Sequence, residues 1–335
     1  MRRLNHVMSS HLNLKDLSYY KTGGSCEQLY CPANIDELKD ALEAITSGGR
    51  PYFLLGGGTN SLVMDTPYAG SVISFHKMNH VSMIKNGIRC GAGISNTAIS
   101  ELALKHGLAG ADWMYYLPGQ VGATVRMNAR CYGGEISQIV NNIKTFTSDG
   151  KLKEYSIETN DRSVFRAYKD TIFMKNNEII AEVELSLSAG NIEQIKEKMD
   201  FCRRDRESKD QFTFPSCGCV FKNNYDPEVS ISSGMLLEEA GAKQLIKERC
   251  RVSESHANFI FNTNHASSRD ILALSMEMRD LVWNEFGVWL DYEMELLGTI
   301  PSDLKTKLEE KRTPQYKTSR LRELRNLFNS KMRQK

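Results

Sequence analysis

The chain has 335 residues, of which 41% are apolar and 25% are charged. At about 100–200 residues per domain this length predicts two or three domains, and the composition excludes collagenous, disordered and disulfide-stapled proteins. The net charge is +2, but residues 302–335 hold 11 basic and 4 acidic side chains, which leaves 32 and 37 in the mildly acidic remainder. We therefore do not expect nucleic acid as the main partner.

The sequence predicts neither a membrane span nor a secretory signal. No apolar run reaches the roughly 18 residues of a span, and Arg2 and Arg3 precede polar residues rather than an apolar segment. The eight cysteines form no CxxC pair and no zinc-spaced cluster with histidine, so no metal site is expected. We expect a cytoplasmic monomer with reduced thiols.

Hydrophobic spacing and turn residues predict strands and helices in an irregular order. The first half is expected to contain a helix at 34–47, a strand at 51–55, a hairpin turn at Asn86-Gly87, a helix at 95–106 and a second hairpin turn at Asp149-Gly150. The second half is expected to contain a helix opening near Asn191, a strand at 258–261, a helix at 268–286, a strand at 289–297 and a charged helical tail broken at Pro314. Because strands and helices do not alternate regularly, we expect an α+β class rather than a doubly wound sheet.

Two glycine-rich segments are candidate phosphate-binding sites. The first, Gly56–Ser61, follows a strand, so its backbone is able to approach a ligand closely and point several N–H groups one way. It lacks the patterns of a Rossmann or a Walker A loop, and on its own a tight turn without a ligand explains it equally well. The second, Pro118–Ala123, feeds a helix start and is better explained alone as a structural turn. Together, the two favour one dinucleotide held by two small lobes.

Cys219 and Glu293 are the candidate reactive groups of the second half. A thiol at the reference pKa near 8.5 is mostly protonated at pH 7 and is able to act as a general acid. Packing is the commoner role of a half-buried cysteine, and a half-exposed strand position is the commoner setting of a glutamate. Tyr168, Lys169 and His256 carry no signal singly.

Taken in order, the segments resemble the UDP-N-acetylenolpyruvoylglucosamine reductase (UDP-N-acetylmuramate dehydrogenase) family. The resemblance runs from about Asn13 to Pro301 and points to the compact branch without a tyrosine-loop insertion. The segments that carry it are Tyr20–Gly24, Gly56–Ser61, Pro118–Ala123, Met127–Ala129, Tyr168, Pro215–Asn223, Val252–Asn262 and Phe286–Gly298.

The resemblance implies a two-lobed FAD-binding domain of the vanillyl-alcohol-oxidase type at 1–185, with a lobe boundary near 70. A substrate-binding α+β domain at 186–301 and a basic tail at 302–335 would follow. NADPH would reduce non-covalent FAD, and hydride from flavin N5 would reduce UDP-N-acetylglucosamine enolpyruvate to UDP-N-acetylmuramate, a peptidoglycan precursor. The implied cofactor-binding residues are Gly56, Gly57, Gly58, Thr59, Asn60, Ser61, Pro118, Gly119, Gly122, Ala123 and Asn128.

By the same resemblance, Cys219 donates the proton, and Glu293 and Lys169 complete the catalytic set. The implied substrate-binding residues are Tyr168, Arg206, Lys222, Asn223 and His256. The chain departs from the family pattern at Lys169, where the family has arginine, at Arg130, where it has glycine, and at Glu248-Arg249, where it has two glycines. These departures leave two alternatives, which are a flavin oxidoreductase of the same fold with another substrate and a non-catalytic flavin-binding protein.

Overall fold

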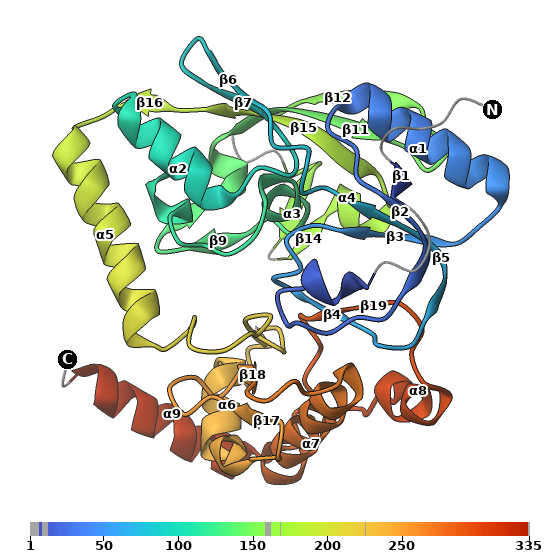
Figure 1. Cartoon of the computed structure of the whole chain (residues 1–335). Helices are drawn as coiled ribbons and strands as arrows, with labels where there is room; N and C mark the ends of the chain where they lie inside the picture. Colours follow the sequence, from blue (N-terminus) through green and yellow to red (C-terminus); the bar gives the residue numbers. More distant parts are fainter. Residues whose placement is uncertain (1–6, 9–12, 158–161, 168, 225, 334–335) are drawn as a thin grey trace. The chain divides into compact units, whose positions relative to one another are not determined.

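The computed structural model describes residues 7–8, 13–157, 162–167, 169–224 and 226–333 (Figure 1). The chain divides into two compact units, each built from separated pieces of sequence. Unit 1 comprises Met1–Leu12, Cys26–Gly57 and Tyr68–Ser208, and unit 2 comprises Asn13–Ser25, Gly58–Pro67 and Lys209–Lys335. Helices and mixed sheets occur in both, as expected for an α+β protein.

The first sheet of unit 1 has the strand order β1-β2-β5-β3. Strands β2 and β3 pair with β5 in parallel, and β1 pairs with β2 antiparallel. The helix expected at 34–47 is confirmed: the Asn34 side chain accepts a hydrogen bond from the Glu37 amide at its start, and Gly49 ends it with φ 61°. The bounds are β1 Val7–Met8, β2 Cys26–Tyr30, α1 Ile35–Gly48, β3 Tyr52–Leu55 and β5 Tyr68–Ser74.

The second sheet of unit 1 is antiparallel, with the order β12-β11-β15-β7-β6. Both expected hairpins are confirmed, since Asn86 and Gly150 adopt φ 57° and 79° in the connections. The two sheets share one apolar core, which includes Ile73 of the first sheet and Val183 of the second. The bounds are β6 Val81–Ile84, β7 Gly87–Gly91, β11 Val140–Phe146, β12 Leu152–Ser156 and β15 Ile179–Ser186.

Helix α5, which the sequence placed at the opening of the second domain, packs instead against α2 and the short helix η2 within unit 1 (Figure 1). Ile195, Met199 and Cys202 are its buried face, so unit 1 extends to Ser208 rather than ending near 185. The remaining elements of unit 1 are α2 Asn96–Lys105, β8 Leu108–Ala109, η2 Asp112–Met114, α3 Val121–Arg126, β9 Arg130–Cys131, β10 Gly134–Glu135, η3 Ile136–Gln138, β13 Phe165–Ala167, β14 Asp170–Thr171, α4 Ile172–Lys175, β16 Ser188–Ala189 and α5 Ile192–Ser208.

Unit 2 is built around helix α7, whose predicted bounds are confirmed. At its start, the Ser267 side chain accepts a hydrogen bond from the Asp270 amide, and the Asp270 side chain accepts one from the Ser267 amide. At its end, Gly287 adopts a left-handed backbone conformation. Strand β4 pairs in parallel with β19, and β17 pairs with β18 antiparallel. The elements are η1 Leu14–Asp16, β4 Ser61–Val63, α6 Ser233–Glu239, η4 Ala242–Gln244, β17 Cys250–Val252, β18 Ile260–Asn262, α7 Ser268–Phe286, β19 Glu295–Leu297, α8 Ser302–Glu309 and α9 Thr318–Arg333.

Two features of unit 2 differ from the sequence expectations. The strand expected at 289–297 is limited to β19, because only Glu295–Leu297 meets a partner strand. The basic C-terminal residues are not a solvated appendage, since Leu321 and Leu324 of α9 belong to the apolar core of unit 2. Among the described residues, no helix is both long and apolar enough to cross a membrane.

Candidate functional site

The glycine loop that ends β3 meets the second glycine-rich turn within unit 1. A Cβ added at Gly56 would lie 3.2 Å from Oε1 of Gln120 and 3.9 Å from Cβ of Ala123. Within the described ranges, the backbone N–H groups of Gly56 and Gly57 donate to no protein acceptor. Two N–H groups without a protein acceptor, beside a closely packed glycine, are suited to bind the pyrophosphate of a dinucleotide.

The turn Pro118–Ala123 supplies fewer donors than its sequence suggests. Pro118 has no N–H group, and the amides of Val121 and Gly122 donate to Ile94 and Ala92 carbonyls at 2.9 Å each. Gly122 is a packing glycine, because an added Cβ would lie 2.6 Å from Cβ of Ala92. Gly119 adopts φ 120° and Gln120 is buried, and their N–H groups donate to no acceptor among the described residues.

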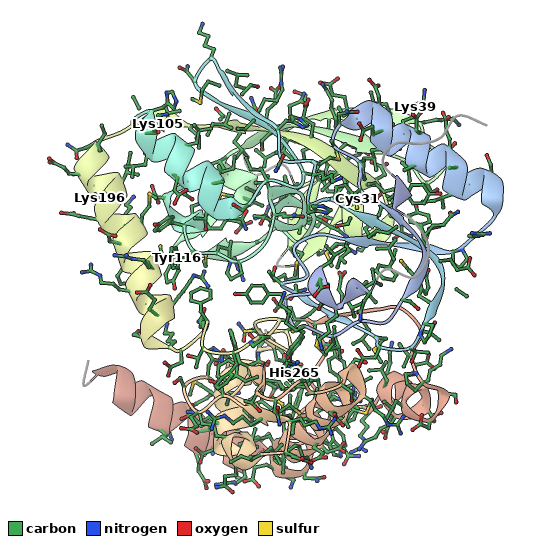
Figure 2. The ribbon with its side chains drawn as sticks, in the orientation of Figure 1. Cys31, Lys39, Lys105, Tyr116, Lys196 and His265 are labelled. Carbon is green, nitrogen blue, oxygen red and sulfur yellow. The ribbon has the colours of Figure 1, made fainter. Side chains whose placement is uncertain are left out.

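Tyr116, labelled in Figure 2, precedes this turn in the left-handed region with φ 57°. Its ring lies 4.9 Å, centroid to centroid, from that of Tyr115, and its amide donates to the Thr97 hydroxyl at 3.2 Å. A left-handed tyrosine is uncommon and costs backbone energy. The chain therefore tolerates strain directly beside the glycine turn.

Asn128 is another left-handed residue of unit 1, with φ 44°. Its Nδ2 donates to Glu135 Oε1 at 2.6 Å, whereas its buried Oδ1 has no hydrogen-bond partner among the residues that the structure describes. Gln120 Oε1 is likewise buried and without a partner. A buried acceptor without a donor costs about 1–3 kcal/mol, so both oxygens are suited to a ligand that brings N–H or O–H groups.

Lys169 occupies the turn of the β13–β14 hairpin, where it is half-buried with φ 52°. Its ammonium acts electrostatically on the Cys131 thiol. Tyr168 lies outside the described residues. Arg130, the other departure from the family pattern in this unit, has an exposed side chain at the start of β9.

Arg206 of α5 contacts the β9 turn rather than standing in open solvent. It is 8% exposed, its Nη2 lies 3.4 Å from Cys131 Sγ, and its guanidinium lies 5.1 Å from the Tyr132 ring centroid. The Tyr132 hydroxyl donates to Asp205 at 2.7 Å. Burial raises the pKa of Cys131 although Arg206 opposes the shift, and burial with the Asp205 bond raises the pKa of Tyr132.

In unit 2, the second half of the glycine loop is tied to the segment that carries Glu293. Asn60 Nδ2 donates to the Glu293 carbonyl at 3.0 Å, and the Asn60 carbonyl accepts from the Glu295 amide at 2.9 Å. Ser61 begins β4 opposite Glu295. Gly58 packs closely on residues 17–19, which follow η1, since a Cβ would lie 2.9 Å from the Tyr19 nitrogen. Much of this half-loop is therefore structural.

The segments that carry Cys219 and Glu293 lie side by side in unit 2, joined by a short backbone ladder. Phe221 pairs antiparallel with Tyr292, and the Val220 carbonyl accepts from the Glu293 amide at 2.8 Å. Both Cys219 and Glu293 are half-buried. The structure thus brings together two residues that are 74 positions apart in the sequence.

Asn258 fixes the Cys219 side of this ladder. Its carbonyl accepts from the Val220 amide at 2.9 Å, its Oδ1 from the Phe221 amide at 3.0 Å, and its Nδ2 donates to the Phe221 carbonyl at 2.8 Å. Cys217 is fully buried, and burial first, then the nearby Cys219 and Glu293, raises its pKa. Of the two neighbouring thiols, Cys219 is therefore the more accessible one.

The predicted substrate-binding residues Lys222, Asn223 and His256 surround the start of α6. The Lys222 carbonyl accepts from the Ser233 hydroxyl, and Asn223 Oδ1 accepts from the Ser233 amide at 3.2 Å. A Cβ at Gly234 would lie 3.4 Å from His256 Cε1. Burial lowers the pKa of His256, and the nearby Lys209 and Lys243 lower it further. A neutral imidazole is thus favoured there.

Sequence reasoning missed Asn60 as a tether of Glu293, and Asn258 and Cys131 as parts of the two sites. Asn60 and Asn258 lay inside segments used for the resemblance, whereas Cys131 did not. Amide tethers of this kind leave no local signal, because they depend on backbone groups brought close by folding. Unpaired glycine N–H groups and buried amide oxygens nevertheless fit the FAD that the resemblance implies, with donors for a pyrophosphate and acceptors for a flavin ring.

Comparison with known proteins agrees with this geometry. Residues 27–156 match the FAD binding domain family, and residues 210–297 match the C-terminal domain of UDP-N-acetylenolpyruvoylglucosamine reductase. The chain is 34% identical to the UDP-N-acetylenolpyruvoylglucosamine reductase of Carboxydothermus hydrogenoformans, over 89% of this chain and 96% of that protein. It is 36% identical to the Treponema denticola enzyme of the same name, over 85% and 92%.

The crystal structure of UDP-N-acetylenolpyruvylglucosamine reductase from Thermus caldophilus superimposes with a TM-score of 0.72 at 28% identity, covering 87% of this chain and 99% of that one. These findings confirm the expected α+β class, the FAD-binding domain and the resemblance drawn from the sequence motifs. The chain belongs to the UDP-N-acetylenolpyruvoylglucosamine reductase family.

Proposed function

We propose that Cys219 donates the proton and that Glu293 is the assisting carboxylate in the reaction of this family. The protein is an FAD-dependent reductase that uses NADPH to convert UDP-N-acetylglucosamine enolpyruvate to UDP-N-acetylmuramate for peptidoglycan precursor synthesis. The observation that carries the residue assignment is the ladder between Val220 and Glu293, which holds the two side chains on adjoining segments.

FAD binding is assigned in this proposal to specific groups of the chain. The N–H groups of Gly56, Gly57, Gly119 and Gln120 hold the pyrophosphate, and Asn128 accepts a hydrogen bond from the flavin ring. Pro118 and Gly122 line the turn without donating, and Ala123, whose N–H group donates to no acceptor among the described residues, is a further candidate donor. Hydride transfer between NADPH and the enolpyruvyl ether is the chemistry that FAD supplies when bound.

The protein's own contribution is to move a proton and to stabilise charge. Hydride addition to the terminal carbon of the enolpyruvyl group places negative charge on its carboxylate, and the adjacent carbon must then take a proton. Cys219 gives that proton as a general acid, a role worth about 10²–10⁴ in rate. Glu293 stabilises or reprotonates the enolic form beside it.

Lys169 supplies the cation for the developing negative charge. An ammonium neutralises a carboxylate as a point charge, but it lacks the planar two-pronged grip of the family's arginine. Lys222, Asn223 and His256 bind the sugar nucleotide, and Tyr168 is proposed to join them. Arg206, being nearly fully buried, is proposed to support substrate binding through the β9 turn that it contacts.

The test is an absorption spectrum followed by steady-state kinetics. We expect the purified protein to absorb near about 450 nm from oxidised flavin, and to oxidise NADPH only when the enolpyruvyl sugar nucleotide is present. NADPH oxidation by the yellow protein that ignores this substrate would favour a same-fold oxidoreductase with another substrate. Flavin without any NADPH oxidation would favour a non-catalytic flavin-binding protein.

The same proposal includes the division of labour, the assembly state and the compartment. The FAD family match lies in unit 1 apart from residues 58–67, and the reductase C-terminal match lies within unit 2. This distribution supports unit 1 as the main FAD-binding part and unit 2 as the substrate-binding part. We propose a cytoplasmic monomer without nucleic-acid partners. Light scattering on the purified holoenzyme should give a mass near 37.9 kDa, and a multiple of it would contradict the monomer.

A further inference from the structure

The chain continues beyond the matched reductase domain, which ends at residue 297. Residues 302–333, here called the C-terminal segment, contain α8 and α9, and both contact α7 within unit 2 (Figure 1). Leu304 and Leu308 of α8 pack against the unit 2 core, and Leu321 and Leu324 of α9 are part of it. The segment is thus built into the unit that carries Glu293.

A buried arginine of α7 depends on the C-terminal segment for its hydrogen bond. Arg279 is 3% exposed, and its Nη2 donates to the Lys307 carbonyl at 2.9 Å. In the described part of the chain that carbonyl is its one hydrogen-bond acceptor, since its Nε has no partner. The guanidinium lies 4.1 Å from the Trp289 ring centroid and 5.0 Å from that of Tyr292. Burial lowers the pKa of Arg279.

Residues of the link between α8 and α9 also contact Trp289. The Arg312 guanidinium lies 4.6 Å from the Trp289 ring centroid and 5.4 Å from that of Trp283. Trp289 Nε1 donates to the Glu310 carbonyl at 3.2 Å, and the Glu310 carboxylate accepts from Arg312 Nε at 2.8 Å. Two guanidinium groups and one backbone carbonyl therefore restrain Trp289.

These restraints continue along the chain to Glu293. Tyr292, which contacts Arg279, precedes Glu293 directly and shares a hydrogen bond of 3.0 Å with the Ser275 hydroxyl. Its ring lies 5.0 Å from that of Phe221 across the ladder. Residues 289–292 belong to no β-strand, although Tyr292 pairs with Phe221 and the Asp291 carbonyl accepts from the Lys222 amide at 2.9 Å. Side-chain stacking therefore acts together with these backbone contacts on the approach to Glu293.

We propose that the C-terminal segment positions Glu293 for the reaction, with Arg312 and the Lys307 carbonyl as its contact points on the stack formed by Arg279, Trp289 and Tyr292. The inference rests on the proposed role of Glu293. Arg312 and Arg279 are positioning residues, since they act on Glu293 through Trp289 and Tyr292. Loosening the stack displaces the carboxylate but leaves the FAD-binding groups of unit 1 as they are.

The test uses the full-length holoenzyme and point variants, because deletion of the C-terminal segment would also remove core leucines. Flavin reduction by NADPH and flavin reoxidation by the enolpyruvyl sugar nucleotide are followed separately in a stopped-flow instrument for Arg312→Ala, Arg312→Lys and Arg320→Ala. Arg320 is the matched control. Arg312 pairs with Asp280 of α7 at 3.8 Å and Arg320 pairs with Glu285 of α7, but among the described residues Arg320 contacts neither Trp289 nor Tyr292. Substrate is varied to separate the limiting rate from the half-saturating concentration.

We expect Arg312→Ala to lower the limiting reoxidation rate about 10-fold, as small misplacements of a reactive group do. The half-saturating concentration and the reduction rate should stay unchanged. Arg312→Lys, which keeps a cation over the rings, should recover most of the rate, and Arg320→Ala should match the wild type. Wild-type kinetics in Arg312→Ala, or equal loss in Arg320→Ala, would overturn the inference. A wild-type protein whose flavin is not reoxidised by this substrate would overturn the proposed function itself.

Discussion

The two units of the molecule differ in whether the polar groups of their candidate sites are hydrogen-bonded within the protein. In the described part of unit 1, the glycine N–H groups near Gln120 and the buried oxygens of Gln120 and Asn128 have no protein partners. In unit 2, Asn258 uses both ends of its side chain on the backbone of Phe221, and Asn60 holds the backbone at Glu293. The comparison suggests that unit 1 is completed by a ligand, whereas unit 2 holds its reactive side chains in place without one.

The largest effect should come from the thiol of unit 2. Cys219→Ala is expected to slow flavin reoxidation by the enolpyruvyl substrate about 10²–10⁴-fold, and to leave flavin reduction by NADPH unchanged, because the thiol serves only proton transfer. Cys219→Ser, which keeps a proton donor, should retain more activity. Rapid-mixing absorbance measures both half-reactions. Reoxidation of Cys219→Ala at the wild-type rate would reduce the residue to packing.

A charge in unit 1 should have the next largest effect. Lys169→Ala removes the proposed cation, and loss of one such electrostatic donor costs about 10²–10³ in turnover. Lys169→Arg restores the family's residue and should be near normal or faster, provided that the longer side chain finds room. The reoxidation rate with saturating substrate is the measurement. If Lys169→Ala reoxidises normally, another cation holds the carboxylate.

The glycine loop that ends β3 in unit 1 gives a test that measures FAD binding rather than turnover. Gly56→Val should weaken FAD binding about 10-fold, or about 1.4 kcal/mol, because the added Cβ would lie 3.2 Å from Gln120 Oε1. Titration of the stripped protein with FAD, followed by flavin fluorescence, measures the Kd. Gly48→Val is the control, since a Cβ there has no atom within 4 Å. Equal FAD affinity in the two variants would mean that Gly56 does not border the cofactor.

The smallest expected effect concerns His256 and the pH dependence of stability. Burial holds the pKa of His256 below its ordinary value of 6.5, so the unfolded chain takes up a proton first as the pH falls. The neutral His256 side chain therefore contributes its full stabilisation above about pH 6.5. This contribution is lost as the pH falls toward the lower pKa of the folded protein. His256→Gln should flatten the acid limb of urea midpoints measured against pH. His106→Gln, at an exposed position, should leave that limb unchanged.

Local signals explain which parts of the fold the sequence predicts well. Helix α7 begins and ends where expected because its capping box at Ser267 and its glycine at 287 are local signals. The glycine loops and the Asn-Gly turn are equally local. By contrast, α5 joins unit 1 through contacts with η2, and no signal within its own sequence specifies that partner.

In the candidate sites, too, local features are predictable from the sequence and contacts made by folding are not. The residue types at Cys219 and Glu293 and the glycine loops are readable from the sequence. The sequence does not show whether a given amide already donates to another backbone group, as the amides of Val121 and Gly122 do. The shortened β19 is a similar case, because its length depends on its partner strand Ser61–Val63, which lies more than 230 residues earlier in the chain.

The discontinuous make-up of unit 2 has a consequence for synthesis on the ribosome. Strand β4 at Ser61–Val63 must wait for β19 at Glu295–Leu297, more than 230 residues later, which at 5–20 residues per second is on the order of ten to fifty seconds. Tyr20, fully buried in the finished protein, waits similarly for the Ile260 carbonyl that its hydroxyl contacts. Unit 1 is complete in the nascent chain by Ser208, so it can fold first while these two early segments remain unpaired and accessible to chaperones.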